Sequence, residues 1–172
     1  MENIICQNWN FYIDKEVTNE YYKKNTQSQC DCIYCENYRK CVVENIPEEL
    51  KDFLNKFGIE IDNPEEIICL DAEDDIINYE VFYPIKGRVV SDEEKNIELA
   101  ECNIRVVPLE QGPNTQMTDP GFYFDILNVT LPFEIKTEQD PFYTQENKER
   151  IKKSIFQLEN MGVMVHNVDL DK

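Results

Sequence analysis

The chain has 172 residues, of which 17 are basic and 35 acidic, so its formal net charge at pH 7 is −18. A chain of this length can sustain one hydrophobic core, and we expect a single domain over residues 1–172. Its negative charge repels phosphate backbones and anionic lipids, which disfavours direct nucleic-acid binding and favours encounter with a basic partner protein.

Neither a targeting signal nor a membrane span is recognisable in the sequence. Glu2 follows Met1, and the apolar patch at residues 4–6 is broken at once by polar residues. No stretch approaches the roughly eighteen apolar residues that a membrane span needs. We therefore expect a cytoplasmic protein whose seven cysteines are free thiols or metal ligands rather than disulfides.

Residues 1–45 are rich in aromatic residues and cysteine, and we expect this segment to pack on a body formed by residues 46–172. Near its start, Trp9, Phe11 and Ile13 alternate with polar residues. Alternation with a period of two is typical of a half-buried strand, so the sequence predicts a strand at residues 9–13.

Two principal helices are predicted. The first runs from Asn45, the expected N-cap, to Gly58, and its apolar residues recur at the spacing of a buried helix face. The second runs from Thr144 to Gly162. Its expected core-facing residues are Ile151, Ile155, Leu158 and Met161.

Strands account for most of the remaining pattern. The strongest follows Gly121, with Phe122, Phe124 and Ile126 expected on one face and Tyr123, Leu127, Val129 and Leu131 on the other. Pro84 predicts a kink or an edge between two shorter strands. The other strands are predicted at residues 67–70, 78–83, 86–90 and 163–168. The pattern predicts an α+β fold with a mostly antiparallel sheet, two principal helices and an N-terminal cysteine-rich knuckle.

Four cysteines are clustered in a Cys-x-Cys-x2-Cys-x5-Cys run: Cys30, Cys32, Cys35 and Cys41. Thiolates two residues apart across a tight turn can face one Zn²⁺ ion, and four sulfur ligands suit a structural site. The acidic neighbours Asp31 and Glu36 speak against it, since they raise thiol pKa values, and a second Cys-x2-Cys pair is missing. Structural zinc, reduced thiols, a redox-active pair and an iron–sulfur cluster all remain open.

Other chemistry finds little support in the sequence. The single histidine, His166, is distant in sequence from every cysteine, which disfavours a Cys-His enzyme. The acidic residues 71–75 lack the spacing and the glycine of a calcium loop, so we interpret them as a solvated strand connection. The five glycines form no phosphate-binding loop, and an enzymatic function is therefore unsupported.

The motif Cys30-x-Cys32-x2-Cys35-x-Asn37-Tyr38 resembles that of an uncharacterised family of bacterial proteins. The resemblance extends to the helix that ends in Phe57-Gly58-Ile59-Glu60 and to Leu131-Pro132-Phe133 after an aromatic strand. It implies no known activity. It implies that the first three cysteines and Asn37 define the motif while Cys41 is outside it, with Asn37 bracing the knuckle through hydrogen bonds to its backbone.

Two functional hypotheses follow. The first is an acidic binding protein that recognises a basic partner, in the manner of an immunity protein or an inhibitor, with a structural cysteine cluster. The alternative is a thiol- or zinc-dependent activity centred on Cys30, Cys32 and Cys35. A component of a larger assembly is a third interpretation, and the sequence specifies neither the partner nor the oligomeric state.

Overall fold

The computed structural model describes residues 1–24, 30–73, 75–90, 96–135 and 145–161. Contacts divide the chain into two compact units, Met1–Ile135 and Lys136–Lys172, where the sequence predicted one domain. The described part of the first unit holds a seven-stranded antiparallel sheet and three α-helices, and that of the second holds a fourth helix. The predicted α+β class with an antiparallel sheet is confirmed, with two helices more than expected.

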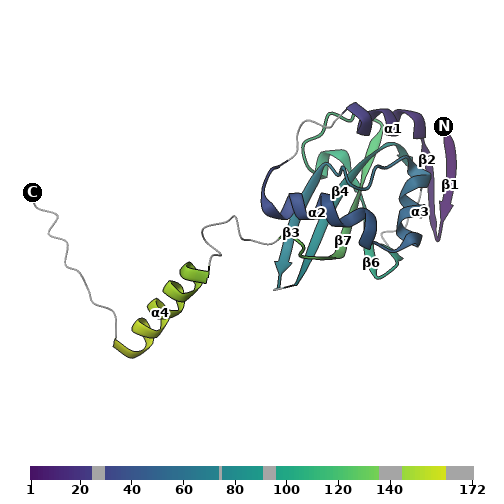
Figure 1. Ribbon diagram of the computed structural model, residues 1–172. Coiled ribbons are helices and arrows are strands. Elements are labelled where there is room, and N and C mark those ends of the chain that lie inside the picture. The colour runs from purple at the N-terminus through teal and green to yellow at the C-terminus, as the bar shows by residue number, and fades with distance from the viewer. Residues whose placement is uncertain (25–29, 74, 91–95, 136–144, 162–172) are drawn as a thin grey trace, which may run out of the picture. The chain divides into compact units, whose positions relative to one another are not determined.

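The sheet has the strand order β1-β2-β4-β7-β6-β5, with β3 paired to β4, and helices α2 and α3 lie over one of its faces (Figure 1). The strands are β1 (Glu2–Cys6), β2 (Trp9–Ile13), β3 (Glu66–Ala72), β4 (Ile76–Val89), β5 (Ile97–Leu99), β6 (Cys102–Pro108) and β7 (Gly121–Pro132). The helices of this unit are α1 (Lys15–Lys24), α2 (Ile33–Asn45), α3 (Glu48–Phe57) and the short 3-10 helix η1 (Leu109–Gln111).

Strand β4 is continuous, although the sequence predicted two strands separated near Pro84. Strand β7 pairs with both halves of β4 along one edge. Along the other edge of β4, the N-terminal half pairs with β3 and the C-terminal end pairs with β2. Pro84 lies between the part of β4 that pairs with β3 and the part that pairs with β2. No neighbouring strand on that edge needs the backbone N–H that proline lacks. Helix α1 closes the gap: the Tyr22 hydroxyl donates to Pro84 O at 2.9 Å, and Lys86 N donates to Thr18 Oγ1 at 3.1 Å.

Strand β7 is central, as predicted, but its two faces differ from the prediction. Two residues of β7, Leu127 and Asn128, lie opposite the single Glu80 of β4, and Asn128 has a φ of 64°. The extra residue is a β-bulge, which shifts the alternation of side chains by one position. Val129 and Leu131 therefore point to the same buried face as the first half of the strand, and their predicted placement opposite Phe122, Phe124 and Ile126 is wrong.

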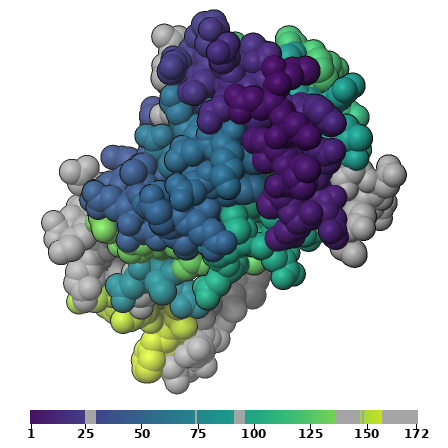
Figure 2. All heavy atoms as spheres, turned by 90° about the vertical axis from the view of Figure 1, so that its right-hand side faces the viewer, coloured from purple at the N-terminus to yellow at the C-terminus, as the bar shows by residue number. Residues whose placement is uncertain are grey.

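An aromatic cluster joins the sheet to α3. The Phe11 ring lies 5.2 Å from that of Phe57 and 5.6 Å from that of Phe124, measured between centroids, and Phe53 stacks on Phe124 at 5.4 Å. The apolar stripe predicted for this helix is confirmed as core. Figure 2 shows the surface of the β1–β2 hairpin, in purple, beside the blue surface of the helices that follow it in sequence.

The ends of α3 are only partly as predicted. Gly58 adopts the left-handed conformation expected of a helix terminator, with a φ of 79°. The N-cap is Pro47 rather than Asn45, because a second helix, α2, occupies residues 33–45 directly upstream. Asn45 is the last residue of α2, and its side-chain amide donates to Cys41 O at 2.8 Å.

The second unit contains α4 (Gln145–Met161), which confirms a helix close to the predicted bounds. Three of its described apolar side chains are exposed: Ile151 is 37%, Ile155 49% and Phe156 64% exposed. The predicted inward stripe is therefore wrong at the two isoleucines. The side chains of Leu158 and Met161, and the strand predicted at 163–168 with His166, lie outside the described residues.

None of the described helices combines the length and the apolar character that crossing a membrane requires.

Candidate metal centre

Three sulfur atoms converge where α2 begins. The Sγ atoms of Cys30, Cys32 and Cys35 all lie within 4.8 Å of one another, and we call these residues the cysteine cluster. Cys32 is the N-cap of α2, and Cys35 lies in its first turn, so the helix itself sets their spacing. Cys30 Sγ accepts a hydrogen bond from the backbone N–H of Cys32 at 3.4 Å, which holds the Cys30 side chain beside the start of the helix.

Cys41, the fourth predicted ligand, lies outside the cluster. Six residues along an α-helix correspond to a rotation of about 240°, so Cys41 and Cys35 occupy different faces of α2. The Cys41 side chain is 1% exposed, and its thiol lies 3.8 Å from Asn37 Oδ1. The structure therefore brings together three of the four predicted ligands.

Asn37 is a structural residue, but its partners are not those expected. It is fully buried, and its side-chain nitrogen donates to Pro132 O at 2.9 Å and to the Tyr79 hydroxyl at 3.2 Å. Its Oδ1 accepts the backbone N–H groups of Glu134 at 2.9 Å and Ile135 at 3.3 Å. These bonds connect α2 to the end of β7 and to the residues beyond it, rather than bracing the cysteine knuckle as predicted.

The thiols of the cluster differ in acidity. The Cys32 side chain makes no capping hydrogen bond, and burial opposes its ionisation, yet the nearby backbone N–H of Cys35 and the Cys30 side chain lower its pKa overall. Burial, followed by the influence of Cys32 and Cys30, raises the pKa of Cys35 to about 12. The expectation that acidic neighbours raise the thiol pKa values is thus wrong for Cys32, because the start of a helix favours negative charge.

The cluster lines a surface pocket of about 290 Å³ together with residues that lead into β3. Arg39 lies one helical turn after Cys35, and its guanidinium donates to Cys30 O at 2.9 Å, which holds Cys30 against the helix. Glu65 also lines the pocket. It accepts hydrogen bonds from the hydroxyls of Tyr21 and Thr115, and burial raises its pKa.

The sequence did not predict the pocket. The i,i+4 spacing of Cys35 and Arg39 was a signal for the arginine, because such residues neighbour each other on a helix surface. Glu65 gave no signal, since it is one of 35 acidic residues and reaches the cluster only through the path of β3.

The geometry of the cluster suits one thiophilic ion. Zinc binds thiolate sulfur at about 2.3 Å, and tetrahedral coordination then separates the sulfur atoms by about 3.8 Å. Three sulfur atoms already within 4.8 Å of one another need to approach by only about 1 Å. Cys30 and Cys32 are exposed and Cys35 is buried, so an ion can enter from the pocket. This group could hold a metal ion, with a fourth position left for another ligand.

Comparisons of the chain with protein-family models, with curated proteins and with solved structures find no match. The resemblance to a bacterial family therefore stays a prediction, and the function is argued from the geometry of this chain.

Proposed function

We propose that this chain is a metal-binding protein in which Cys30, Cys32 and Cys35 hold a structural Zn²⁺ ion at the start of α2. The observation that carries the proposal is the approach of three sulfur atoms to within 4.8 Å of one another. The ion would tie Cys30, which precedes α2, to Cys35 inside it, and so fix the start of the helix. Metal-thiolate bonds stabilise such short segments because the binding free energy becomes folding free energy.

Zinc content tests this proposal directly. Protein purified without chelator and kept reduced is expected to contain one zinc per chain, measured by plasma mass spectrometry together with titration of free thiols. Cys32→Ser is expected to lose most of the zinc. Cys6→Ser is the matched control, because Cys6 is a partly exposed thiol outside the cluster. Wild-type protein that takes up no zinc while its thiols are reduced would contradict the proposal.

Thiol–disulfide exchange is the second candidate function. It is favoured by the Cys-x2-Cys pair at a helix start, with an exposed Cys32 of lowered pKa and a buried Cys35. The Cys32 thiolate would attack a partner disulfide, and Cys35 would then displace the partner, leaving a Cys32–Cys35 disulfide and two partner thiols. Rapid alkylation of Cys32 in zinc-saturated protein would favour exchange, whereas protection by zinc favours the metal site.

Recognition of a basic partner protein stays a prediction that rests on the net charge of −18. Its test is binding to cationic proteins over a range of salt concentrations, since steering by net charge weakens as ionic strength rises. The metal site and the partner are separate proposals, because zinc-free variants can be tested for the same binding.

A further inference from the structure

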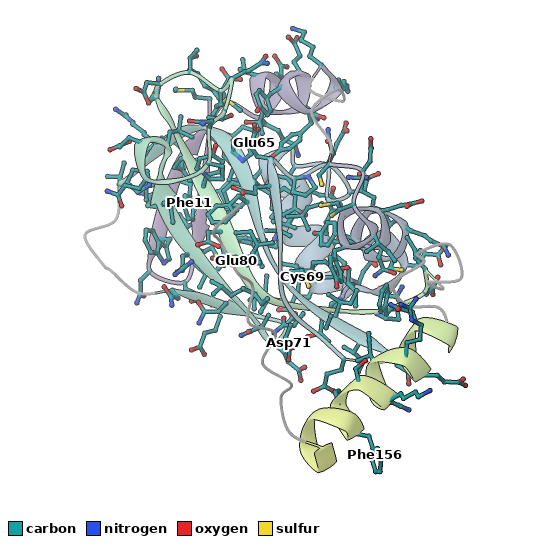
Figure 3. All side chains as sticks on the ribbon, turned by 90° about the vertical axis from the view of Figure 1, so that its left-hand side faces the viewer. Phe11, Glu65, Cys69, Asp71, Glu80 and Phe156 are labelled. Atoms are coloured by element: carbon teal, nitrogen blue, oxygen red, sulfur yellow. The ribbon has the colours of Figure 1, made fainter. Side chains whose placement is uncertain are left out.

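A further cysteine, Cys69, lies on β3 two residues after Ile67, which lines the pocket of the cysteine cluster. In the sheet Cys69 of β3 is paired with Tyr79 of β4, and directly paired residues point to the same face. The Tyr79 hydroxyl donates to the backbone carbonyl of Tyr34 at 3.0 Å, and Tyr34 stands between Cys32 and Cys35 in sequence. Figure 3 shows Cys69 and Asp71 on β3, with Glu65 directly before the strand.

From this placement we infer that Cys69 is the fourth sulfur ligand of the metal ion proposed at the cysteine cluster, an inference that rests on the proposed function. The sheet supplies the ligand that the helix lacks, so the ion would join α2 to β3. This assignment replaces Cys41, which is buried on another face of α2 with its thiol 3.8 Å from Asn37 Oδ1. Cys69 is also outside the 4.8 Å group, so its side chain has to turn toward the ion. Four sulfur ligands make the closed tetrahedral sphere that structural zinc sites use.

The surroundings of Cys69 support its recruitment. The residue is partly buried, and its thiol lies 3.8 Å from the backbone carbonyl oxygen of Asp71. That contact is weak, so rotation of the side chain toward the cluster costs little.

Three carboxylates of the pocket compete with Cys69 for the fourth position. Glu65 lines the same pocket but already accepts hydrogen bonds from Tyr21 and Thr115. Asp62 and Glu66 are exposed carboxylates on the wall of the pocket. A carboxylate ligand would give three sulfur atoms and one oxygen around the ion, a sphere that spectroscopy separates from four sulfur atoms.

Cobalt substitution tests the inference. The full-length reduced protein, its Cys69→Ala variant and the Cys6→Ala control would each be titrated with Co²⁺, and the sulfur-to-cobalt charge-transfer absorption recorded. Wild-type and control are expected to show the spectrum of a tetrahedral four-thiolate site. Cys69→Ala is expected to lose on the order of a quarter of the charge-transfer intensity, since one thiolate in four is removed. Its affinity for Zn²⁺, measured against a chromophoric chelator, is expected to fall on the order of a hundredfold.

The outcomes separate the two proposals. A wild-type spectrum that Cys69→Ala leaves unchanged would overturn the role of Cys69 and leave the three-cysteine site intact. Wild-type protein that binds no Co²⁺ or Zn²⁺ would overturn both. Circular dichroism of the metal-free variants checks that Cys69→Ala folds like the control.

Discussion

At the scale of single residues, the hydrogen bonds of buried polar side chains determine which substitutions destabilise the fold. Asn37 satisfies a strand carbonyl and two backbone N–H groups at once, and Asp125, at 1% exposure, accepts a hydrogen bond from Arg105 at 2.7 Å. A buried polar group that loses its partner costs more than the bond contributed, because water does not replace it. Each of these residues therefore gives a sharp prediction.

Asn37→Ala is expected to lower the free energy of unfolding by about 3 kcal/mol, because it leaves Pro132 O and the Glu134 N–H without their partner. Asn45→Ala is the control on the same helix: Asn45 is exposed and donates one hydrogen bond, so its loss is expected to cost under about 1 kcal/mol. Urea denaturation followed by tryptophan fluorescence measures both. If both variants lost the same free energy of unfolding, the hydrogen bonds of Asn37 between α2 and the end of β7 would not be important for stability.

Asp125 predicts a dependence of stability on pH. Burial raises its pKa to about 6, opposed by Arg105 from β6 and reinforced by Glu80 from β4. The folded protein thus holds a proton that the unfolded chain releases near pH 4. The contribution of Asp125 to stability is therefore greatest below pH 4 and is lost as the pH rises through about 6.

In Asp125→Asn this loss is expected to vanish, because the amide is neutral at every pH. Relative to wild type, the variant should gain about 1–2 kcal/mol between pH 4 and pH 7. Denaturant midpoints at several pH values give the measurement, with the exposed Asp52→Asn as control. A difference between variant and wild type that is constant with pH would contradict the raised pKa.

At the scale of elements, irregularities within strands set which side chains enter the core. The bulge at Asn128 turns Val129 and Leu131 inward, and Pro84 occupies a gap between two partner strands. The strands predicted at residues 9–13, at 67–70 and after Gly121 correspond to β2, β3 and β7. The bulge in β7 was not predicted, because one inserted residue cannot be recognised until the pairing with β4 is known.

Asn128 tests the bulge. Its φ of 64° suits asparagine and glycine, whereas a β-branched residue is strained there. Asn128→Gly is expected to change the free energy of unfolding by less than about 0.5 kcal/mol, while Asn128→Val lowers it by about 1–2 kcal/mol. Thermal melting compares the two variants with wild type. A valine variant as stable as the glycine variant would contradict the left-handed conformation.

The part of the candidate site that is formed by residues close in sequence could be predicted. Cys32 and Cys35 lie within one turn, so their spacing alone places both sulfur atoms together, and Cys30 is close enough in sequence to follow. The prediction of Cys41 as a ligand is wrong because residues 33–45 form a helix rather than a turn. The helix places Cys41 on a different face from Cys35. Cys69, the proposed fourth ligand, is positioned by the pairing of β3 with β4, and the sequence holds no local signal of that placement.

At the scale of the whole molecule, the chain comprises two compact units, and the described core residues all belong to Met1–Ile135. Residues 1–45 contribute Phe11, Tyr22 and Tyr38 to this core, so the cysteine-rich segment is integral to the first unit. The helical pattern of α4 could be predicted from its periodicity. Its exposure could not, because an apolar stripe does not specify what it packs against.

Removal of residues 136–172 is expected to leave the first unit folded, since no residue of the described core cluster is lost. The melting temperature of the shortened chain should lie within about 3 °C of the full chain, and its zinc content should be the same. Differential scanning calorimetry makes the comparison. A fall of more than about 10 °C would show that the second unit stabilises the first.

X-ray absorption at the zinc edge on the full, reduced protein tests the central claim most directly, because it reports the atoms bound to the ion. We expect a first shell dominated by sulfur at about 2.3 Å, which requires the cysteine cluster to bind together. A shell of nitrogen or oxygen at about 2.0 Å, or zinc that washes out while the thiols remain reduced, would contradict a metal ion held by Cys30, Cys32 and Cys35.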